Sequence, residues 1–368
     1  MHRFNITYKI FAENETIAKN IAISICHENT VEIPSDIVPN GFIKEEIVGK
    51  IEKIEKKNDY FKILISYSNQ SIGFEINQLF NIIHGNTSMY KNVRVDEVKL
   101  NSDLKKIFPG PKFGINGFRK LIGHNNSILC PVLKPQGLSS DEIASLAYEF
   151  IISGADIIKE DHNLSNQKYS TFRDRIEKTV KAVEKANRET GRKSMYFPHV
   201  SSNFENIIDD IDFAIEAGAD GIMLIPSLVG YSFVYYISKN KKNNFPILSH
   251  PSFSGGHVLS EKNGISHGVY YGTFQRIMGA DMSIFPNTGG RFEFTKDQCL
   301  EISKKCKDTK GVGKSIFPAI GGGMSINTAS EMNSMFGKDA VFLLGGGLIR
   351  YKDNMARVLK DIRNVLDK

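Results

Sequence analysis

A strand–helix unit that repeats eight times constrains the fold of this 368-residue chain more than any other feature. From residue 128 onward, short apolar runs alternate with stretches of helical periodicity. The apolar runs predict strands at 128–133, 156–158, 195–198, 221–225, 246–249, 282–285, 315–319 and 341–344. The periodic stretches predict helices at 140–152, 171–189, 204–217, 228–239, 268–278, 296–306, 328–336 and 354–366.

Local signals support these boundaries. Ser139 with Glu142 and Thr295 with Gln298 have the spacing of a capping box, which marks the start of a helix. Gly154 lies where a helix ends before the next strand. Eight such units over about 240 residues have the number and size of a (β/α)8 TIM barrel. An open doubly wound sheet is the alternative, although it usually has fewer strands.

Residues 1–118 predict a smaller α+β domain of the ferredoxin-like type. We expect strands at 4–11, 45–56, 60–67 and 93–99, and helices at 15–26 and 76–83. Asn58 and Asp59 are the expected turn of a hairpin. The segment 108–114 is rich in Pro and Gly, so we expect a loop there between a domain at 1–118 and a barrel at 119–368.

Composition excludes several classes of protein. The net charge of +6 is spread along the chain without a long basic stripe, so we expect no nucleic-acid partner. No apolar run approaches the ~18–20 residues of a membrane span, and the N-terminus has no apolar signal-peptide core. The four cysteines lack CxxC spacing, which indicates reduced thiols in a cytoplasmic protein.

The second predicted barrel strand ends abruptly in charge, at Lys159, Glu160 and Asp161, and His162 follows. Side chains alternate along a strand, so Lys159 and Asp161 point to one face and Glu160 to the other. Burying such charges costs several kcal/mol unless each has a partner. An isolated motif of this kind is most simply a salt bridge at the end of a strand.

This motif is not isolated, because other predicted strands also end in polar residues. In a (β/α)8 barrel the active site lies at the carboxyl ends of the strands. Any one polar residue there could be structural, but together they favour an active site. The residues at these ends include Lys134, His199, His250 and Arg291.

Two triple-glycine loops follow the seventh and eighth predicted strands, where barrel enzymes commonly bind phosphate. Glycine lets backbone N–H groups approach an anion closely. Either loop alone could be a flexible turn, but two on adjacent strands favour phosphate. The predicted phosphate ligands are Gly321, Gly322, Gly323, Gly345 and Gly346.

Several of these motifs resemble those of the RuBisCO large subunit. They are Leu133-Lys134-Pro135 with Gly137-Leu138-Ser139, Gly154 to Asp161, Arg173-Asp174-Arg175, and the two glycine loops. The resemblance implies that Lys159 is carbamylated by CO2 and binds magnesium. It also implies a homodimer or larger assembly, in which Glu28 and Asn86 complete the active site of the partner subunit.

The chain departs from the carboxylase pattern at four places. Gln136 replaces a second lysine, His162 replaces the third metal ligand, a glutamate, and Pro251 replaces an arginine. The loop after the sixth strand has no lysine before Lys296. These changes argue against ribulose-bisphosphate carboxylation. The segments 250–255 and 285–287 instead resemble the RuBisCO-like proteins (form IV type).

The resemblance implies a metal-dependent enzyme that makes or consumes an enolate of a phosphorylated sugar or sugar acid. Lys159, Asp161 and His162 would hold Mg2+, and Mn2+ would compete because imidazole suits transition metals. Lys134 would move the proton, and Arg291 would assist the glycine loops. His250 would be either a second acid–base group or a substrate ligand.

The leading expectation for the reaction is decarboxylation or C–C cleavage of a 3-oxo sugar-acid phosphate, of the 3-oxo-isoapionate-4-phosphate type. The alternative is an enolase or isomerase that acts on a methylthioribulose phosphate. Carboxylation ranks last of the enzymatic reactions. A non-catalytic homologue is a further alternative, but it has no need to keep a buried charge cluster.

Overall fold

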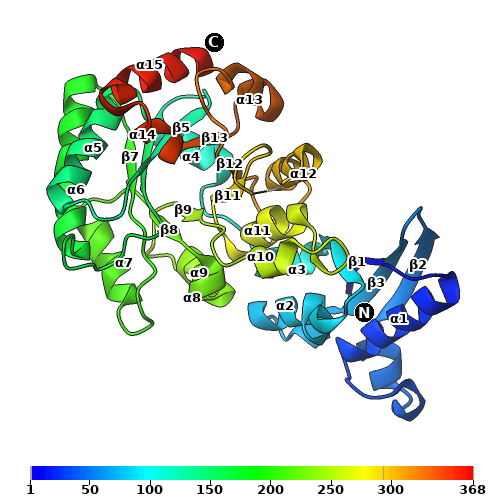
Figure 1. The fold of residues 1–368 in the computed structure, drawn as a ribbon. Helices are drawn as coiled ribbons and strands as arrows, with labels where there is room; N and C mark the ends of the chain where they lie inside the picture. Colours follow the sequence, from blue (N-terminus) through cyan, green and yellow to red (C-terminus); the bar gives the residue numbers. More distant parts are fainter. Residues whose placement is uncertain (1, 293, 368) are drawn as a thin grey trace.

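The computed structural model describes residues 2–292 and 294–367, so the predicted domain ends at residues 1 and 368 lie outside the described part. Two sheets organise the chain. A five-stranded sheet belongs mainly to the N-terminal region, and an eight-stranded parallel sheet forms the barrel (Figure 1). Among the described residues, no helix combines the length and apolarity needed to cross a membrane.

The N-terminal region has the predicted ferredoxin-like arrangement. Its four antiparallel strands have the order β4-β1-β3-β2, and one helix follows β1 while another follows β3. The elements are β1 (Arg3–Ile10), α1 (Glu15–Glu28), β2 (Lys50–Lys56), β3 (Phe61–Ser68), α2 (Ile76–His84) and β4 (Val93–Lys99). The hairpin turn at Asn58 and Asp59 is confirmed, since Lys57 N donates to Tyr60 O at 2.8 Å.

The strand predicted at 45–56 is wrong in its first part. Residues Ile43–Ile47 form a short π-helical turn, and the strand begins only at Lys50. The reason lies in the register, because Lys50 is the first residue of β2 with a partner, Ser66 near the end of β3. Before Lys50 the backbone leaves β3, since the Gly49 N–H donates to the Cys26 carbonyl oxygen of α1 at 3.3 Å.

The second sheet is the predicted barrel. Its strands have the order β7-β6-β5-β13-β12-β11-β9-β8. A parallel bridge between His199 and Met223 joins the two ends, with Val200 N donating to Met223 O at 3.0 Å. The barrel is therefore closed and is not an open sheet. The strands are β5 (Ile128–Leu133), β6 (Ile157–Glu160), β7 (Met195–Phe197), β8 (Ile222–Leu224), β9 (Ile247–Ser249), β11 (Met282–Pro286), β12 (Phe317–Gly321) and β13 (Val341–Leu344).

Helices cover the outside of the barrel, and both predicted capping boxes are present. The main helices are α5 (Ser140–Ile152), α6 (Phe172–Thr190), α7 (Ile207–Glu216), α9 (Tyr231–Lys239), α12 (Lys296–Lys307), α13 (Ala329–Phe336) and α15 (Met355–Leu366).

Two predicted helices are not continuous. The one expected at 228–239 is broken by Gly230, whose φ of +94° separates α8 (Pro226–Val229) from α9. The one expected at 268–278 begins as a π-helix, η5 (Val269–Phe274), before α11 (Gln275–Met278).

The segment between the two sheets contains a helix that the sequence did not predict, α4 (Gly114–Ile122). The Phe118 ring meets the Phe317 ring edge-on at 5.7 Å, so α4 closes the barrel at the amino end of its strands. The predicted boundary at 118 falls inside α4 and stays a prediction. The barrel region also contains a short strand, β10 (Gly264–Ile265), which pairs in parallel with β4 of the N-terminal sheet.

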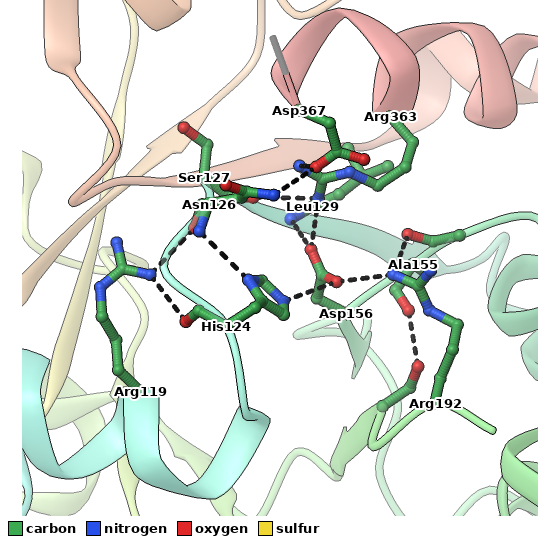
Figure 2. A network of polar contacts seen from close by, with 12 residues as sticks. Arg119, His124, Asn126, Ser127, Leu129, Ala155, Asp156, Arg192, Arg363 and Asp367 are labelled. Carbon is green, nitrogen blue, oxygen red and sulfur yellow. Dashed lines mark hydrogen bonds and ion pairs between the residues drawn. The ribbon is translucent and has the colours of Figure 1, made fainter.

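A buried carboxylate organises the amino end of the barrel (Figure 2). Asp156, which precedes β6, is 2% exposed and accepts the Leu129 N–H at 2.8 Å. It also accepts hydrogen bonds from Arg363 of α15 at 2.6 Å, Arg192 at 2.9 Å and His124 at 3.1 Å. The network ties α15 and two loops to the first strands. A cavity of about 370 Å³ beside it is lined by these paired charges and by Lys193.

Asp156 should contribute stability that depends on pH. Burial alone would raise its pKa, but the hydrogen bond from His124 and the charge of Arg363 outweigh burial and hold the pKa below its ordinary value. A carboxylate with a depressed folded pKa stabilises the protein above the unfolded pKa of about 3.9, and this contribution is lost as the pH falls through the folded pKa.

We therefore expect Asp156→Asn to lower the free energy of unfolding by about 3 kcal/mol or more at pH 7, because both guanidinium groups lose their buried partner. Urea unfolding of both proteins at pH 7 and at pH 3 measures the effect. The difference between wild type and variant should shrink at the lower pH. An equal difference at both pH values would contradict this role for the ionised carboxylate.

Candidate active site at the carboxyl ends of the barrel strands

Lys134 and Asp161 meet where β5 and β6 end. The two strands are paired so that Leu133 lies beside Glu160, which makes Lys134 and Asp161 the next residues of each strand. The Lys134 Nζ lies 2.7 Å from Asp161 Oδ2, and Asp161 is 5% exposed. The structure thus brings together two of the predicted residues in a close ion pair.

Lys159 lies one residue before the end of β6 and is 2% exposed. Its Nζ donates a hydrogen bond to the carbonyl of Glu160 at 2.8 Å. Burial lowers the pKa of Lys159 to about 8, because the charged ammonium form is poorly solvated there. The neutral amine form of Lys159 is therefore much more populated at neutral pH than that of an exposed lysine.

Glu160 points to the opposite face of β6, as the alternation predicts. Glu160 and Arg175 of α6 have no exposed side-chain surface, and Arg175 Nε donates to Glu160 Oε1 at 2.7 Å. The Tyr196 hydroxyl donates to the same oxygen at 2.6 Å, and the backbone N–H of His199 donates to Oε2 at 3.1 Å. This anchor was not predicted from the sequence.

The rings of His162 and His250 stack, with centroids 4.4 Å apart and an interplanar angle of 19°. Burial lowers the pKa of both, and that of His250 falls well below its usual value. The Ser252 backbone N–H donates to His250 Nδ1 at 3.2 Å. The proton of the neutral ring therefore lies on Nε2, so His250 offers a hydrogen-bond donor to a ligand.

His199 has the opposite tautomer. Its Nδ1 lies 2.8 Å from the Leu164 carbonyl oxygen, which can only accept, so Nδ1 carries the proton. The Nε2 atom is buried and has no hydrogen-bond partner among the described residues. The sequence identified His199 only as a polar residue at the end of a predicted strand.

The two glycine loops lie beside these groups. A Cβ added at Gly345 would come 3.8 Å from Lys134 Nζ, and one at Gly323 would come 3.0 Å from Asn287 Nδ2. Gly322 and Gly323 have φ values of +96° and +76°, while Gly321 ends β12. Gly346 begins the short helix α14 (Gly346–Ile349), and space is open beside it.

Three predicted residues lie apart from this cluster or at its edge. Arg291 is exposed after β11, and its charge helps to lower the pKa of His162, for which burial is the largest cause. Asn86 Nδ2 donates to Glu28 Oε1 at 2.8 Å and to Glu32 Oε1 at 3.3 Å. These last contacts all lie within the N-terminal domain, and Figure 1 shows α1, which carries Glu28, turned away from the barrel.

The donor set decides whether a divalent cation fits. The described residues contain no group of three His, Cys, Asp or Glu side chains placed to hold a metal ion. Asp161 and His162 supply two donors, so a third must come from a carbamate on Lys159. A carbamate forms on a neutral amine, which the lowered pKa of Lys159 favours. The residues fit a cation only in this carbamylated form.

Together, the fold and the cluster define a class: a (β/α)8 barrel protein with a ferredoxin-like domain before it and buried lysines at the carboxyl ends of its strands. The family model of the ribulose bisphosphate carboxylase large chain, catalytic domain, matches residues 114–367. The chain therefore belongs to the RuBisCO large-chain family, and within it to the RuBisCO-like proteins.

Individual relatives cover almost the whole chain. The 5-methylthioribulose-1-phosphate isomerase of Rhodospirillum rubrum is 32% identical over 362 residues, which are 96% of this chain and 93% of the relative. The 2,3-diketo-5-methylthiopentyl-1-phosphate enolase of Bacillus pumilus is 27% identical, and the match covers 87% of this chain and 80% of the relative. The solved RuBisCO-like protein of Rhodopseudomonas palustris has a TM-score of 0.88 at 26% identity and covers 100% of this chain and 98% of its own.

The predicted phosphate site can be tested at Gly346. A Cβ there would meet no atom within 4 Å, so Gly346→Val should fold normally while filling space that an anion would use. We expect the affinity for inorganic phosphate, measured by calorimetry, to fall at least about tenfold, or 1.4 kcal/mol. Gly256→Val, at another glycine with open space beside it, is the control. Equal phosphate affinity in all three proteins would place the anion elsewhere.

Proposed function

We propose that this protein isomerises or enolises a phosphorylated ketose of the 5-methylthioribulose 1-phosphate type. The observation that carries the proposal is the similarity to the Rhodospirillum rubrum isomerase, which extends over 96% of the chain. This conclusion reverses the order of the two reactions expected from the sequence. The sugar-acid decarboxylase ranks second because the isomerase and enolase relatives name the other substrate class.

An aldose–ketose type of isomerisation requires a group that removes a proton from a carbon next to a carbonyl. The resulting enolate must be stabilised, and a proton must return at another carbon. An enolase that acts on a diketone phosphate shares the first half of this chemistry. One strand-end cluster can therefore serve either reaction.

In this proposal Lys134 moves the proton. Its Nζ lies 2.7 Å from Asp161 Oδ2, and a Cβ on Gly345 would come 3.8 Å from it, so the lysine is close both to the carboxylate and to the loop that would hold the phosphate. A proton-transfer group must be within reach of the substrate carbon, and the closeness of Lys134 to the proposed phosphate loop supports this role. Asp161 orients the lysine through the ion pair, and Lys134 must release one proton and become a neutral amine before it can take a proton from the substrate carbon.

His250 donates a hydrogen bond to the substrate oxygen on which negative charge develops. Its proton lies on Nε2, and burial keeps the ring neutral, so it acts as a donor and not as a base. This assignment chooses between the two roles left open by the sequence. Arg291 and the two glycine loops bind the phosphate.

Mg2+ or Mn2+ would be held by Asp161, His162 and a carbamate on Lys159. When bound, the cation would supply a Lewis acid that polarises the carbonyl and stabilises the enolate. Glu160 holds β6 so that Lys159 and Asp161 share the face that looks into the barrel.

We propose further that the active unit is at least a homodimer. Glu28 and Asn86 are hydrogen-bonded to each other on the surface of the N-terminal domain, and the resemblance to RuBisCO supports a role for them in a neighbouring site. Relatives of the same fold are described as dimeric, in Hyperthermus butylicus, and as octameric, in Pyrococcus horikoshii.

The reaction is tested with 5-methylthioribulose 1-phosphate and a 3-oxo sugar-acid phosphate, with products followed by NMR. We expect isomerised or enolised product from the first substrate and no CO2 from the second. Lys134→Met should lower kcat about 10²- to 10⁴-fold, the usual contribution of a proton-transfer group. Decarboxylation of the second substrate with no reaction of the first would overturn the proposal.

The shared site is tested by coexpressing two inactive variants, Lys159→Met and Glu28→Gln. If each site draws on two subunits, hybrid dimers contain one intact site, and random pairing restores about one quarter of the wild-type activity. A mixture as inactive as its components, although hybrids form, would show that Glu28 acts within its own subunit or not at all.

A further inference from the structure

A tight turn follows His250 at the carboxyl end of β9. Ser254 N donates to the Pro251 carbonyl at 3.2 Å, which closes a four-residue turn. Phe253 has a φ of +65°, while Ser252 does not have a positive φ. This combination is a type II turn, whose third position requires a left-handed backbone and normally holds glycine.

Phenylalanine at this position is unfavourable, since a Cβ crowds the backbone in the left-handed region. Among the described residues, only Glu32, Phe74 and Phe253 adopt a positive φ without being glycine. A glycine at 253 would form the same turn without strain. Phe74 has the same strain, so strain alone assigns no role, and the position of Phe253 beside the site is what distinguishes it.

The turn is fixed from both sides. Ser252 N donates to His250 Nδ1, and the Ser254 hydroxyl lies 2.7 Å from the Tyr271 hydroxyl. Ser254 is 2% exposed, but Phe253 is 76% exposed. A single exposed aromatic ring is ordinary on a protein surface. Here, however, the ring is held by a strained and well-anchored turn, three residues from the proposed oxygen-binding histidine.

The barrel order indicates where this turn lies relative to the glycine loops. β9 is separated from β13 by β11 and β12 on one side and by four strands on the other. The Phe253 turn thus lies across the barrel mouth from the loop after β13, where Gly345 and Gly346 would bind phosphate. In 5-methylthioribulose 1-phosphate the phosphate and the methylthio group are at opposite ends of the carbon chain.

We propose that Phe253 determines substrate specificity by contacting the methylthio end of the substrate. A thioether makes favourable contacts with an aromatic ring, and its methyl group is apolar. The proposal rests on the proposed function. It adds a residue that selects the thioether substrate over a sugar phosphate without that group.

The test compares two substrates: 5-methylthioribulose 1-phosphate and the analogue with hydrogen in place of the methylthio group. Phe253→Gly should lower the ratio of their kcat/KM values at least about tenfold, the scale expected for loss of a small apolar contact. The same variant should raise Tm, because glycine relieves the strained turn. Phe253→Leu should lower the ratio less, because it keeps an apolar side chain.

Phe74→Gly is the matched control, because Phe74 is an exposed phenylalanine with a φ of +62° in the N-terminal domain. It should raise Tm and leave the substrate ratio unchanged. If the wild type turns over the methylthio substrate and Phe253→Gly leaves the ratio of kcat/KM values unchanged, the proposed role of Phe253 is wrong while the proposed function stands. A smaller assembly of Phe253→Gly with an unchanged ratio would assign the ring to a subunit contact. If the wild type turns over neither substrate, the proposed function itself fails.

Discussion

The buried carboxylate of Glu160 is the interaction on which the rest of the site depends. It has no exposed surface, and it accepts hydrogen bonds from α6, from the Tyr196 hydroxyl and from the backbone of His199. These hydrogen bonds hold the Glu160 side chain on the outward face of β6, so the side chains of its neighbours Lys159 and Asp161 lie on the inward face. The same carboxylate fixes His199, whose bridge to Met223 closes the barrel. One buried ion pair thus links barrel closure to the orientation of the lysine.

The two ends of the barrel use buried charge for different purposes. At the amino end, Asp156 is surrounded by donors that leave its carboxylate fully paired, and the network holds α15 against the strands. At the carboxyl end, Lys159 and His199 are buried, and the Nε2 atom of His199 has no hydrogen-bond partner among the described residues. Unused polar capacity of this kind is costly in a folded protein, and it is most readily explained by a ligand.

Much of this architecture could be predicted because the apolar runs and the helix caps are local. The alternation in β6 predicted correctly that Lys159 and Asp161 share a face, and the glycine runs marked both rim loops. The closeness of Lys134 to Asp161 depends on the register between β5 and β6, which no local pattern encodes. The tautomers of His199 and His250 depend on single backbone groups of Leu164 and Ser252. The left-handed backbone of Phe253 was invisible, since the residue type argues against it.

The most direct test of the central claim is the fate of the hydrogen next to the substrate carbonyl. If Lys134 removes it, the hydrogen joins an ammonium group with two other hydrogens, which in D2O are deuterium. Substrate or product recovered from 5-methylthioribulose 1-phosphate should then carry deuterium at about two-thirds of the reacting positions if the three hydrogens are equivalent. Lys134→Met should abolish this incorporation. Turnover in D2O without incorporation, or incorporation that persists in Lys134→Met, would contradict the account.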